Sequence, residues 1–265
     1  MKKRPSPLNK KHFDGCLWIA ADVHLGPHAP KTAAAFYAFL ERAAQQADTL
    51  ILCGDIFEAW IGDDVAKRPS PWLEAVIHAL RVLTKTTQLY LMRGNRDFLL
   101  GEQFATHVNG QCLPDELIIS TPQCEFLLAH GDQFCTDDEA YQRYRRVVHQ
   151  PWLQRLFLCL PLRLRKKIAT SLRQQSKQRN YAVLGDIHEP DTALFLEEHA
   201  QTLLIHGHTH QPAIHRFGAQ QALTRIVIPD WEYDHSHPRR GGWVSIDPSG
   251  KVGLHLDGQP TRYLC

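Results

Sequence analysis

Asp22 and His24 directly follow an uninterrupted apolar run that begins at Cys16. Such a short run, rich in branched and aromatic residues, predicts a buried strand. Side chains two residues apart on extended backbone point to the same side, so the carboxylate and the imidazole are expected to lie together. These two groups offer two ligands to a divalent cation, and the sequence therefore predicts a metal site at the end of this strand.

Four later apolar runs also end in ligand-type residues, which are Asp55, Asn95, His130 and the pair His208 and His210. A lone histidine is usually a surface or core residue, but five motifs in order, each after a predicted strand, favour one shared site. The residues suffice for two ions if one carboxylate bridges them, and we assign the bridge to Asp55. Mixed nitrogen and oxygen ligation suits Mn²⁺, Fe or Zn²⁺, and we expect two Mn²⁺ ions per chain.

Predicted strands alternate with predicted helices in the first half of the chain. Apolar residues at helical spacing predict helices over 32–47 and about 71–83. Each polar motif stands at the carboxyl end of a strand, where ligands bind in layered α/β folds. Short strands are expected to close the chain, and the segment from Trp231 to Trp243 is expected to form an edge loop near the site.

The composition is that of a globular protein, with 43% hydrophobic and 22% charged residues in a chain of 265. A net charge of +2 argues against binding polyanions by bulk charge. Seven cysteines without a CxxC pair argue against a disulfide framework and favour a reducing cytosol, with Cys53 and Cys135 as small buried residues. Residues 1–15 are basic without an apolar core behind them, so we expect a flexible tail rather than a signal peptide.

Residues 140–185 contain no Asp or Glu but many basic residues, namely Arg143, Arg145, Arg146, Arg155, Arg163, Arg165, Lys166, Lys167, Arg173, Lys177 and Arg179. Apolar residues between them are spaced for one helical face, and the helices are expected to break near Pro151 and Pro161. We expect an inserted helical lid over about 138–182. It is either a solvated helical hairpin or a basic, apolar cover over an anionic lipid-like ligand or a membrane surface.

The motif order DxH…GD…GN…H…GHxH is similar to that of the calcineurin-like metallophosphoesterases. Most members carry His after the GN pair, whereas this chain has Arg96. With FEAWIGDD, HGDQFCTDD and IHGHTHQPAIH, the chain from about Leu17 onward resembles the UDP-2,3-diacylglucosamine pyrophosphohydrolases of lipid A biosynthesis. The resemblance implies one domain over 16–265, with a four-layer α/β architecture in which a β-sandwich is flanked by helices and carries the lid.

The resemblance also implies roles for individual residues. One ion would be held by Asp22, His24, Asp55 and His210. The other would be held by Asp55, Asn95, His130 and His208. The substrate contacts would be Asn95, Arg96, Asp138, Ser176, Asn180 and His208, and the catalytic residues Arg96, Asn95 and His208. The family has a lysine three residues after the lid asparagine, where this chain has Val183, so Lys177 or Arg179 would have to substitute.

The implied activity is metal-dependent hydrolysis of the pyrophosphate bond of UDP-2,3-diacylglucosamine. Activated water would attack the α phosphorus and release UMP and 2,3-diacylglucosamine 1-phosphate (lipid X). Arg96 would neutralise phosphate oxygens, and a phosphate leaving group needs no general acid. The implied location is the cytoplasmic face of the inner membrane of a Gram-negative cell, as a peripheral protein with no obligate protein partner and no nucleic-acid partner.

Two alternatives remain. The first is another dinuclear-metal phosphodiesterase that acts on nucleotides or nucleic acid, and the second is a non-catalytic module that kept the fold. The second should have lost ligands, yet none is missing here. Further motif residues are expected to order the ligands and loops, and these are Asp63, Asp64, Asp132, Asp137 and His206.

Overall fold

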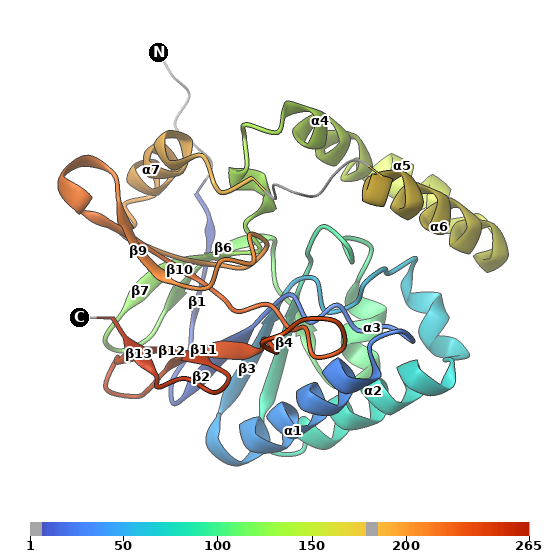
Figure 1. Ribbon diagram of the computed structural model, residues 1–265, viewed down its shortest axis with the longest axis horizontal. Helices are drawn as coiled ribbons and strands as arrows, with labels where there is room; N and C mark the ends of the chain where they lie inside the picture. The colour runs from blue at the N-terminus through green and yellow to red at the C-terminus, as the bar shows by residue number, and fades with distance from the viewer. Residues whose placement is uncertain (1–6, 179–184, 265) are drawn as a thin grey trace.

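Two stacked β-sheets form the centre of the protein, whose computed structural model describes residues 7–178 and 185–264 (Figure 1). The seven-stranded sheet runs in the order β13 (Arg262–Tyr263), β12 (Val252–Leu256), β11 (Gly242–Ile246), β2 (Leu17–Ala20), β3 (Thr49–Cys53), β4 (Gln88–Met92) and β5 (Gln111–Cys112). The six-stranded sheet runs in the order β1 (Asn9–His12), β6 (Glu116–Ser120), β7 (Glu125–Ala129), β8 (Leu203–His206), β10 (Leu223–Val227) and β9 (Ile214–Phe217).

Helices cover the outer faces of the sheets. The larger sheet packs against α1 (Pro30–Gln46) and α2 (Pro71–Leu83), and α3 (Glu102–His107) joins the same core. On the other side, α7 (Glu189–Glu198) packs over β7 and β8 through Leu196. These layers confirm the predicted four-layer α/β sandwich.

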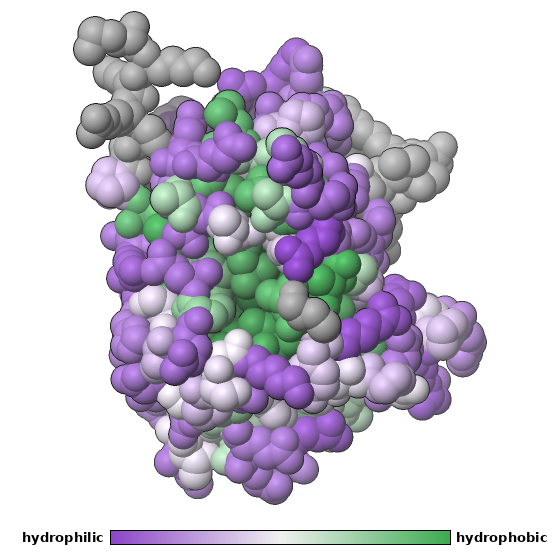
Figure 2. Space-filling view, turned by 90° about the vertical axis from the view of Figure 1, so that its left-hand side faces the viewer, coloured by the Kyte–Doolittle hydropathy of each residue, from purple (hydrophilic) through white to green (hydrophobic). Residues whose placement is uncertain are grey.

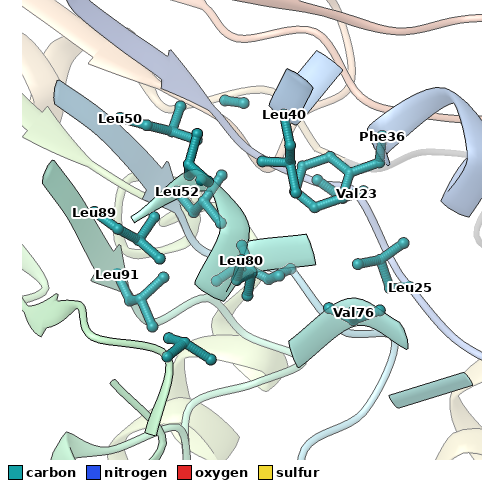
Figure 3. Close-up of a cluster of buried hydrophobic side chains, with 14 of the residues drawn as sticks. Val23, Leu25, Phe36, Leu40, Leu50, Leu52, Val76, Leu80, Leu89 and Leu91 are labelled. Carbon is teal, nitrogen blue, oxygen red and sulfur yellow. The ribbon is translucent and has the colours of Figure 1, made fainter. Parts of the chain in front are cut away.

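The central strand β3 shows why the sheets are stacked. All five of its residues are buried, and successive side chains alternate between the two faces. Leu50 and Leu52 pack with Phe36 and Leu40 of α1 in the core beneath the helices (Figure 3). Ile51 and its neighbour Cys53 point into the core between the sheets. A strand buried on both faces reads as a continuous apolar run, which is what the sequence showed.

The predicted helices agree closely with the structure. The second occupies 71–83 as expected, whereas α1 begins at Pro30 rather than Thr32. Proline is suited to the first helical turn because its missing N–H has no partner there in any case. The backbone N–H groups of Lys31 and Thr32 instead donate to Asp234, at 3.0 and 2.9 Å.

The prediction of a flexible tail over 1–15 is wrong for its second half. Residues Asn9–His12 form β1, which pairs in parallel with β6, and Phe13 is buried between the sheets. The local sequence is polar, so the strand depends on backbone hydrogen bonds to a distant partner rather than on its own side chains. Residues 1–6 lie outside the described part of the chain.

The inserted helices are α4 (Glu139–Val148), α5 (Pro151–Leu158) and α6 (Leu162–Gln178). We call these three helices the lid. They project beyond the sheets as one arm in Figure 1. The breaks fall at Pro151 and Pro161, as the sequence predicted. Among the described residues, no helix combines the length and the apolar character needed to span a membrane.

The opposite side of the molecule carries α7, β9 and β13. Figure 2 shows hydrophobic residues in a hollow on this side, bordered by hydrophilic ones. Residues at the margin of the inter-sheet core are only partly buried, among them Ile214, Leu256 and Leu264. Cys53 and Cys135 are buried and free, as expected, and the other cysteines within the described residues are also free.

Candidate metal centre

The predicted ligands meet where parallel strands of both sheets end. In the larger sheet β2 pairs with β3 and β3 with β4, all in parallel. In the smaller sheet β7 pairs in parallel with β8. The two edges are joined by a hydrogen bond of 2.9 Å from the backbone N–H of His208 to Asp22 Oδ2. The structure therefore brings the five motifs together at the carboxyl ends of these strands.

One group of donors consists of Asp22, His24 and His210, whose ligand atoms all lie within 4.8 Å of one another. His210 Nε2 is 3.4 Å from Asp22 Oδ1 and 3.4 Å from His24 Nε2. Asp22 is fully buried, and its Oδ1 accepts no hydrogen bond. A buried carboxylate oxygen without a donor, facing two imidazoles, fits a cation at this position.

A second group of donors consists of Asp55, Asn95, His130 and His208. Asn95 Oδ1 is 3.0 Å from His130 Nε2 and 2.9 Å from His208 Nδ1. Asp55 Oδ1 is 3.7 Å from His130 Nε2. Its other oxygen, Oδ2, is 3.9 Å from His24 Nε2 in the first group. The two oxygens of Asp55 thus face different groups, which is the arrangement that a bridging carboxylate needs.

Asp22 also takes part in both groups. Its ligand atoms lie within 4.8 Å of those of Asp55 and His130 as well. The donor set is therefore compact and contains only nitrogen and oxygen atoms. It fits two hard or borderline divalent cations better than a thiolate-seeking metal.

The ligand backbones are unusual. Nine non-glycine residues among those described have positive φ, and five of them are Asp22, His24, Asp55, His208 and His210. Their φ angles lie between 51° and 67°. L-residues rarely occupy this region unless the surrounding structure fixes them, and such strain concentrates at functional sites.

Two glycines, Gly54 after β3 and Gly94 after β4, allow the loops of the site to approach one another closely. Gly54 has φ +85°, and a Cβ there would lie 2.7 Å from His130 Nδ1. A Cβ at Gly94 would collide with Asp55 Oδ1. Glycine in the GD and GN motifs therefore provides the space into which the ligands fit.

Asp97 is a positioning residue that the sequence analysis missed. It is fully buried and accepts backbone hydrogen bonds from Gly94 at 2.7 Å, Asp55 at 3.1 Å, Ile56 at 2.7 Å and Phe57 at 3.3 Å. It thus ties the loop that carries Asp55 to the loop that carries Asn95. Its place two residues after Asn95 in RGNRDFL was the only available signal.

Burial and neighbouring charges shift the pKa values of the candidate ligands, downward for some residues and upward for others. Burial lowers the pKa of His24 and of His208 to about 3, so both imidazoles are neutral and able to ligate at neutral pH. Burial also acts on His130, but the carboxylates of Asp55 and Asp22 outweigh it and raise its pKa to about 9. Burial raises the pKa of Asp55 to about 8 despite the attraction of His130.

The lid is anchored to the metal centre through Asp132, two residues after His130. Tyr141 of α4 donates from its hydroxyl to Asp132 Oδ2 at 2.6 Å, and Arg145 Nε donates to the same oxygen at 2.7 Å. The Tyr141 ring also stacks on the ring of His208, with centroids 6.1 Å apart. The first lid helix therefore contacts both the loop and a ligand of the site.

A second anchor of the lid is Arg165, one of the basic residues that the sequence analysis grouped together. Arg165 is only 3% exposed. Its guanidinium pairs with both carboxylate oxygens of Asp64 and with the carbonyl of Ile61. Sequence alone could not separate it from Arg163 or Lys166, which are exposed, because the partner lies a hundred residues away.

The remaining lid surface is apolar as well as basic. Nine large hydrophobic residues among those described are markedly exposed, and six belong to the lid. They are Tyr144, Val147, Trp152, Leu156, Leu158 and Leu164. Trp152 and Leu156 are the most exposed, at 64% and 59%, and lie one turn apart on α5. An ordinary solvated hairpin does not present such a surface.

The predicted substrate contacts are placed unevenly. Asn95 and His208 lie in the second donor group, and the backbone N–H of Arg96 donates to Asp55 Oδ1 at 2.7 Å. Asp138 caps α4 by accepting from the backbone N–H of Tyr141 at 2.9 Å. Ser176 belongs to α6, but its side chain is not among those described, and neither is that of Lys177. Asn180, Arg179 and Val183 lie outside the described residues.

The other residues expected to order the loops differ in their contacts. Asp63 accepts from Trp60 Nε1 at 2.9 Å and from the backbone of Gly101 at 3.0 Å, so it orders the loop before α3. His206 is buried, with Nδ1 2.8 Å from its neighbour's carbonyl. Asp137 is exposed and lies 3.9 Å from His188, which is not one of the predicted ligands.

Comparisons with known proteins agree with this geometry. A sequence profile of the calcineurin-like phosphoesterase family matches residues 17–212. The chain is 43% identical over 247 residues to a UDP-2,3-diacylglucosamine hydrolase from Bordetella pertussis, covering 92% of this chain and 96% of that protein. A protein of the same name from Haemophilus influenzae is 41% identical over 243 residues, covering 91% of this chain and 98% of that protein.

Solved structures show the same fold. A dimetal phosphatase from Danio rerio superimposes with a TM-score of 0.52 at 11% sequence identity, covering 97% of this chain and 99% of that one. At this identity the likeness concerns the fold alone.

Proposed function

The chain belongs to the calcineurin-like phosphoesterase family, and from this premise we propose that it hydrolyses UDP-2,3-diacylglucosamine in lipid A biosynthesis. Water attacks the α phosphorus, the bond to the bridging oxygen breaks, and the products are UMP and 2,3-diacylglucosamine 1-phosphate. One structural observation supports the proposal independently of the names of the relatives. Two groups of metal donors lie beside a lid whose surface is both basic and apolar.

The donor residues divide between two cations. Asp22, His24 and His210 would hold one, while Asn95, His130 and His208 would hold the other, with Asp55 between them. Two divalent cations bound there would act as Lewis acids toward the phosphate and the attacking water. We propose Mn²⁺, because the donors are imidazole nitrogens together with carboxylate and amide oxygens.

Arg96 and the lid complete the recognition of the substrate. The backbone of Arg96 is fixed on Asp55, and its guanidinium can neutralise two phosphate oxygens at once. A guanidinium keeps its proton at neutral pH, but the leaving group is itself a phosphate and needs no proton donor. Asp138, Ser176 and Asn180 are proposed contacts of the acylated sugar.

The apolar lid surface is suited to acyl chains. Each buried methylene contributes roughly 0.8 kcal/mol, so two chains can dominate the affinity for the substrate. The exposed cations Arg163, Lys166 and Lys167 stand on the same lid and would attract anionic headgroups. We therefore place the protein as a peripheral protein on the cytoplasmic face of the inner membrane, where the substrate is embedded.

The decisive experiment measures UMP release from UDP-2,3-diacylglucosamine in detergent micelles. Metal-free protein is compared with protein given Mn²⁺, and restoration of activity by Mn²⁺ is expected. Activity that chelation leaves unchanged would contradict the metal-dependent mechanism.

A second assay separates the proposal from a nuclease or a general phosphodiesterase. Double-stranded DNA and bis-p-nitrophenyl phosphate are tested under the same conditions, and turnover on both is expected to be negligible. Hydrolysis of DNA that falls steeply with salt, without UMP release from the lipid substrate, would favour the nuclease instead.

A further inference from the structure

Asp230 lies in the segment between β10 and β11, which the function described above does not use. The residue is buried. The backbone on either side is tied to the metal centre, because Ile228 N donates to the carbonyl of His206 at 2.7 Å and Trp231 N donates to the carbonyl of Asp22 at 3.0 Å. Asp230 is thus fixed between the loops that deliver ligands from both sheets.

The rest of this segment makes the position rigid. The Trp231 side chain is 5% exposed and packs edge-on against Phe39 of α1, with ring centroids 5.2 Å apart. Farther along, Glu232 and Arg240 form an antiparallel bridge, with backbone hydrogen bonds of 2.9 and 3.0 Å. This packing and this backbone pairing fix the segment that carries the Asp230 carboxylate.

The carboxylate of Asp230 faces the imidazole of His210. Asp230 Oδ2 is 3.7 Å from His210 Nδ1. The other nitrogen of the same ring, Nε2, is 3.4 Å from Asp22 Oδ1 and 3.4 Å from His24 Nε2. The ring therefore lies between two carboxylates, with Nε2 turned toward the donor group and Nδ1 turned away from it.

Arg240 neutralises Asp230 from the solvent side. Its Nε lies 3.2 Å from Asp230 Oδ1, and its Nη2 lies 2.8 Å from Oδ2. The Arg240 side chain is 44% exposed, whereas that of Asp230 is 3% exposed. A buried carboxylate needs such a partner, and the guanidinium of Arg240 provides it.

We propose that Asp230 is the positioning residue for His210, orienting Nε2 toward the cation that Asp22 and His24 also bind. A ligating histidine commonly directs its other ring nitrogen at a carboxylate, which fixes the ring and strengthens the ligand. The inference rests on the proposed function in that it requires a cation in the first donor group. It adds a residue from a segment to which the sequence gave no role.

A purely structural role for Asp230 makes a different prediction. If Asp230 only fastened this segment through its ion pair, then removing Asp230 or removing Arg240 would have the same effect on metal binding. If Asp230 orients His210, a change at Asp230 should weaken one cation site, whereas the removal of Arg240 should not.

The test titrates Mn²⁺ into metal-free protein by calorimetry, with thermal unfolding measured in parallel. Asp230→Asn is expected to leave two sites, one of them weakened by about tenfold to a hundredfold. Arg240→Gln is expected to keep both sites at parent affinity and to lower only the melting temperature. The control is Asp186→Asn, which breaks a bidentate pair with Arg225 away from the ligands and should also keep both sites.

Parent-like affinities in Asp230→Asn, or equal weakening in Asp230→Asn and Arg240→Gln, would overturn the inference. Should Asp230→Asn fail to fold, Asp230→Glu is used, which keeps the charge but displaces it. It is expected to weaken the same site, and parent-like binding there would equally overturn the inference.

The outcome is separable from that of the proposed function. A parent that binds two Mn²⁺ ions but releases no UMP from the lipid substrate would refute the activity and leave the role of Asp230 to the calorimetry. An active parent with an unaffected Asp230→Asn variant would refute the inference alone.

Discussion

The metal centre and the lid are built in opposite ways. In the candidate metal centre, the buried or half-buried donor residues follow strand ends, and their loops are fixed by hydrogen bonds such as those to Asp97. In the lid, no side chain of α4 or α5 is fully buried, and polar anchors at Asp132 and Asp64 attach it to the rest.

The difference follows from what each region must do. Metal ligands must be held to within about half an ångström, and rigid elements serve this purpose. Under the proposed function, the lid covers a two-chain lipid and must offer apolar surface to it, so it cannot bury that surface in its own core. The proposed function thus assigns catalysis and lipid binding to separate parts of the chain.

The largest effect is expected at the bridge of the metal centre. Asp55→Ala removes the carboxylate that faces both donor groups, so UMP release should fall by at least about a thousandfold. Metal analysis of the purified variant should show fewer than two cations per chain. Asp14→Ala, at an exposed aspartate, should behave like the parent. An active, metal-replete Asp55→Ala variant would remove the bridging role.

The rigidity of the centre is tested at Asp97. Asp97→Asn places an amide N–H₂ group where backbone N–H groups need acceptors, so the free energy of unfolding should fall by about 2–3 kcal/mol. Urea denaturation measures the loss. Asp115→Asn, which removes the negative charge from one ion pair with Arg93, should lose less than about 1 kcal/mol. Equal losses in the two variants would mean that Asp97 does not tie the loops together.

The membrane role of the lid is tested at its exposed lysines. The double substitution Lys166→Gln and Lys167→Gln should weaken binding to anionic vesicles by about 2 kcal/mol, or roughly thirtyfold. Sedimentation with vesicles containing phosphatidylglycerol measures the partition. Lys67→Gln with Lys85→Gln, at exposed lysines outside the lid, is the matched control. Unchanged partitioning of the lid variant would contradict a membrane-facing lid.

The smallest effect is expected at the second anchor of the lid. Arg165→Met releases α6 from Asp64, so KM for the lipid substrate should rise roughly fivefold, which is about 1 kcal/mol. The kcat should change little, because the metal ligands are untouched. Faster hydrogen exchange in the described part of α6 would locate the change, and parent-like exchange there would contradict the anchor.

The same anchor predicts a pH dependence. The hydrogen bond from Arg165 lowers the pKa of Asp64 below its ordinary value of 3.8. The carboxylate therefore contributes its full stabilisation above that value and loses it as the pH falls through the lowered pKa. Exchange in α6 should accelerate in this acidic range in the parent but not in Arg165→Met. An identical acid response in both proteins would exclude Asp64 as its source.

The sequence by itself determined the buried strands that precede the motifs, the order of the motifs and the residue types that the candidate site brings together. These features depend on local periodicity and on residue type, as at Asp22 and His24 after the first apolar run. The proline breaks of the lid were equally local. A strand that is buried on both faces appears in the sequence as a continuous apolar run, so it can be recognised without knowing which strands pair with it.

Only the tertiary structure decided which residues support these features. The pairing of β1, the burial of Arg165, the hydrogen bonds of Asp97 and the proposed role of Asp230 depend on partners distant in the chain or on backbone groups that carry no sequence signal. A charged residue is read as solvated until its partner is seen, because burying a charge is favourable only when another group compensates it. The residue types of the site can therefore be read from local sequence, whereas the positions of their side chains depend on long-range contacts.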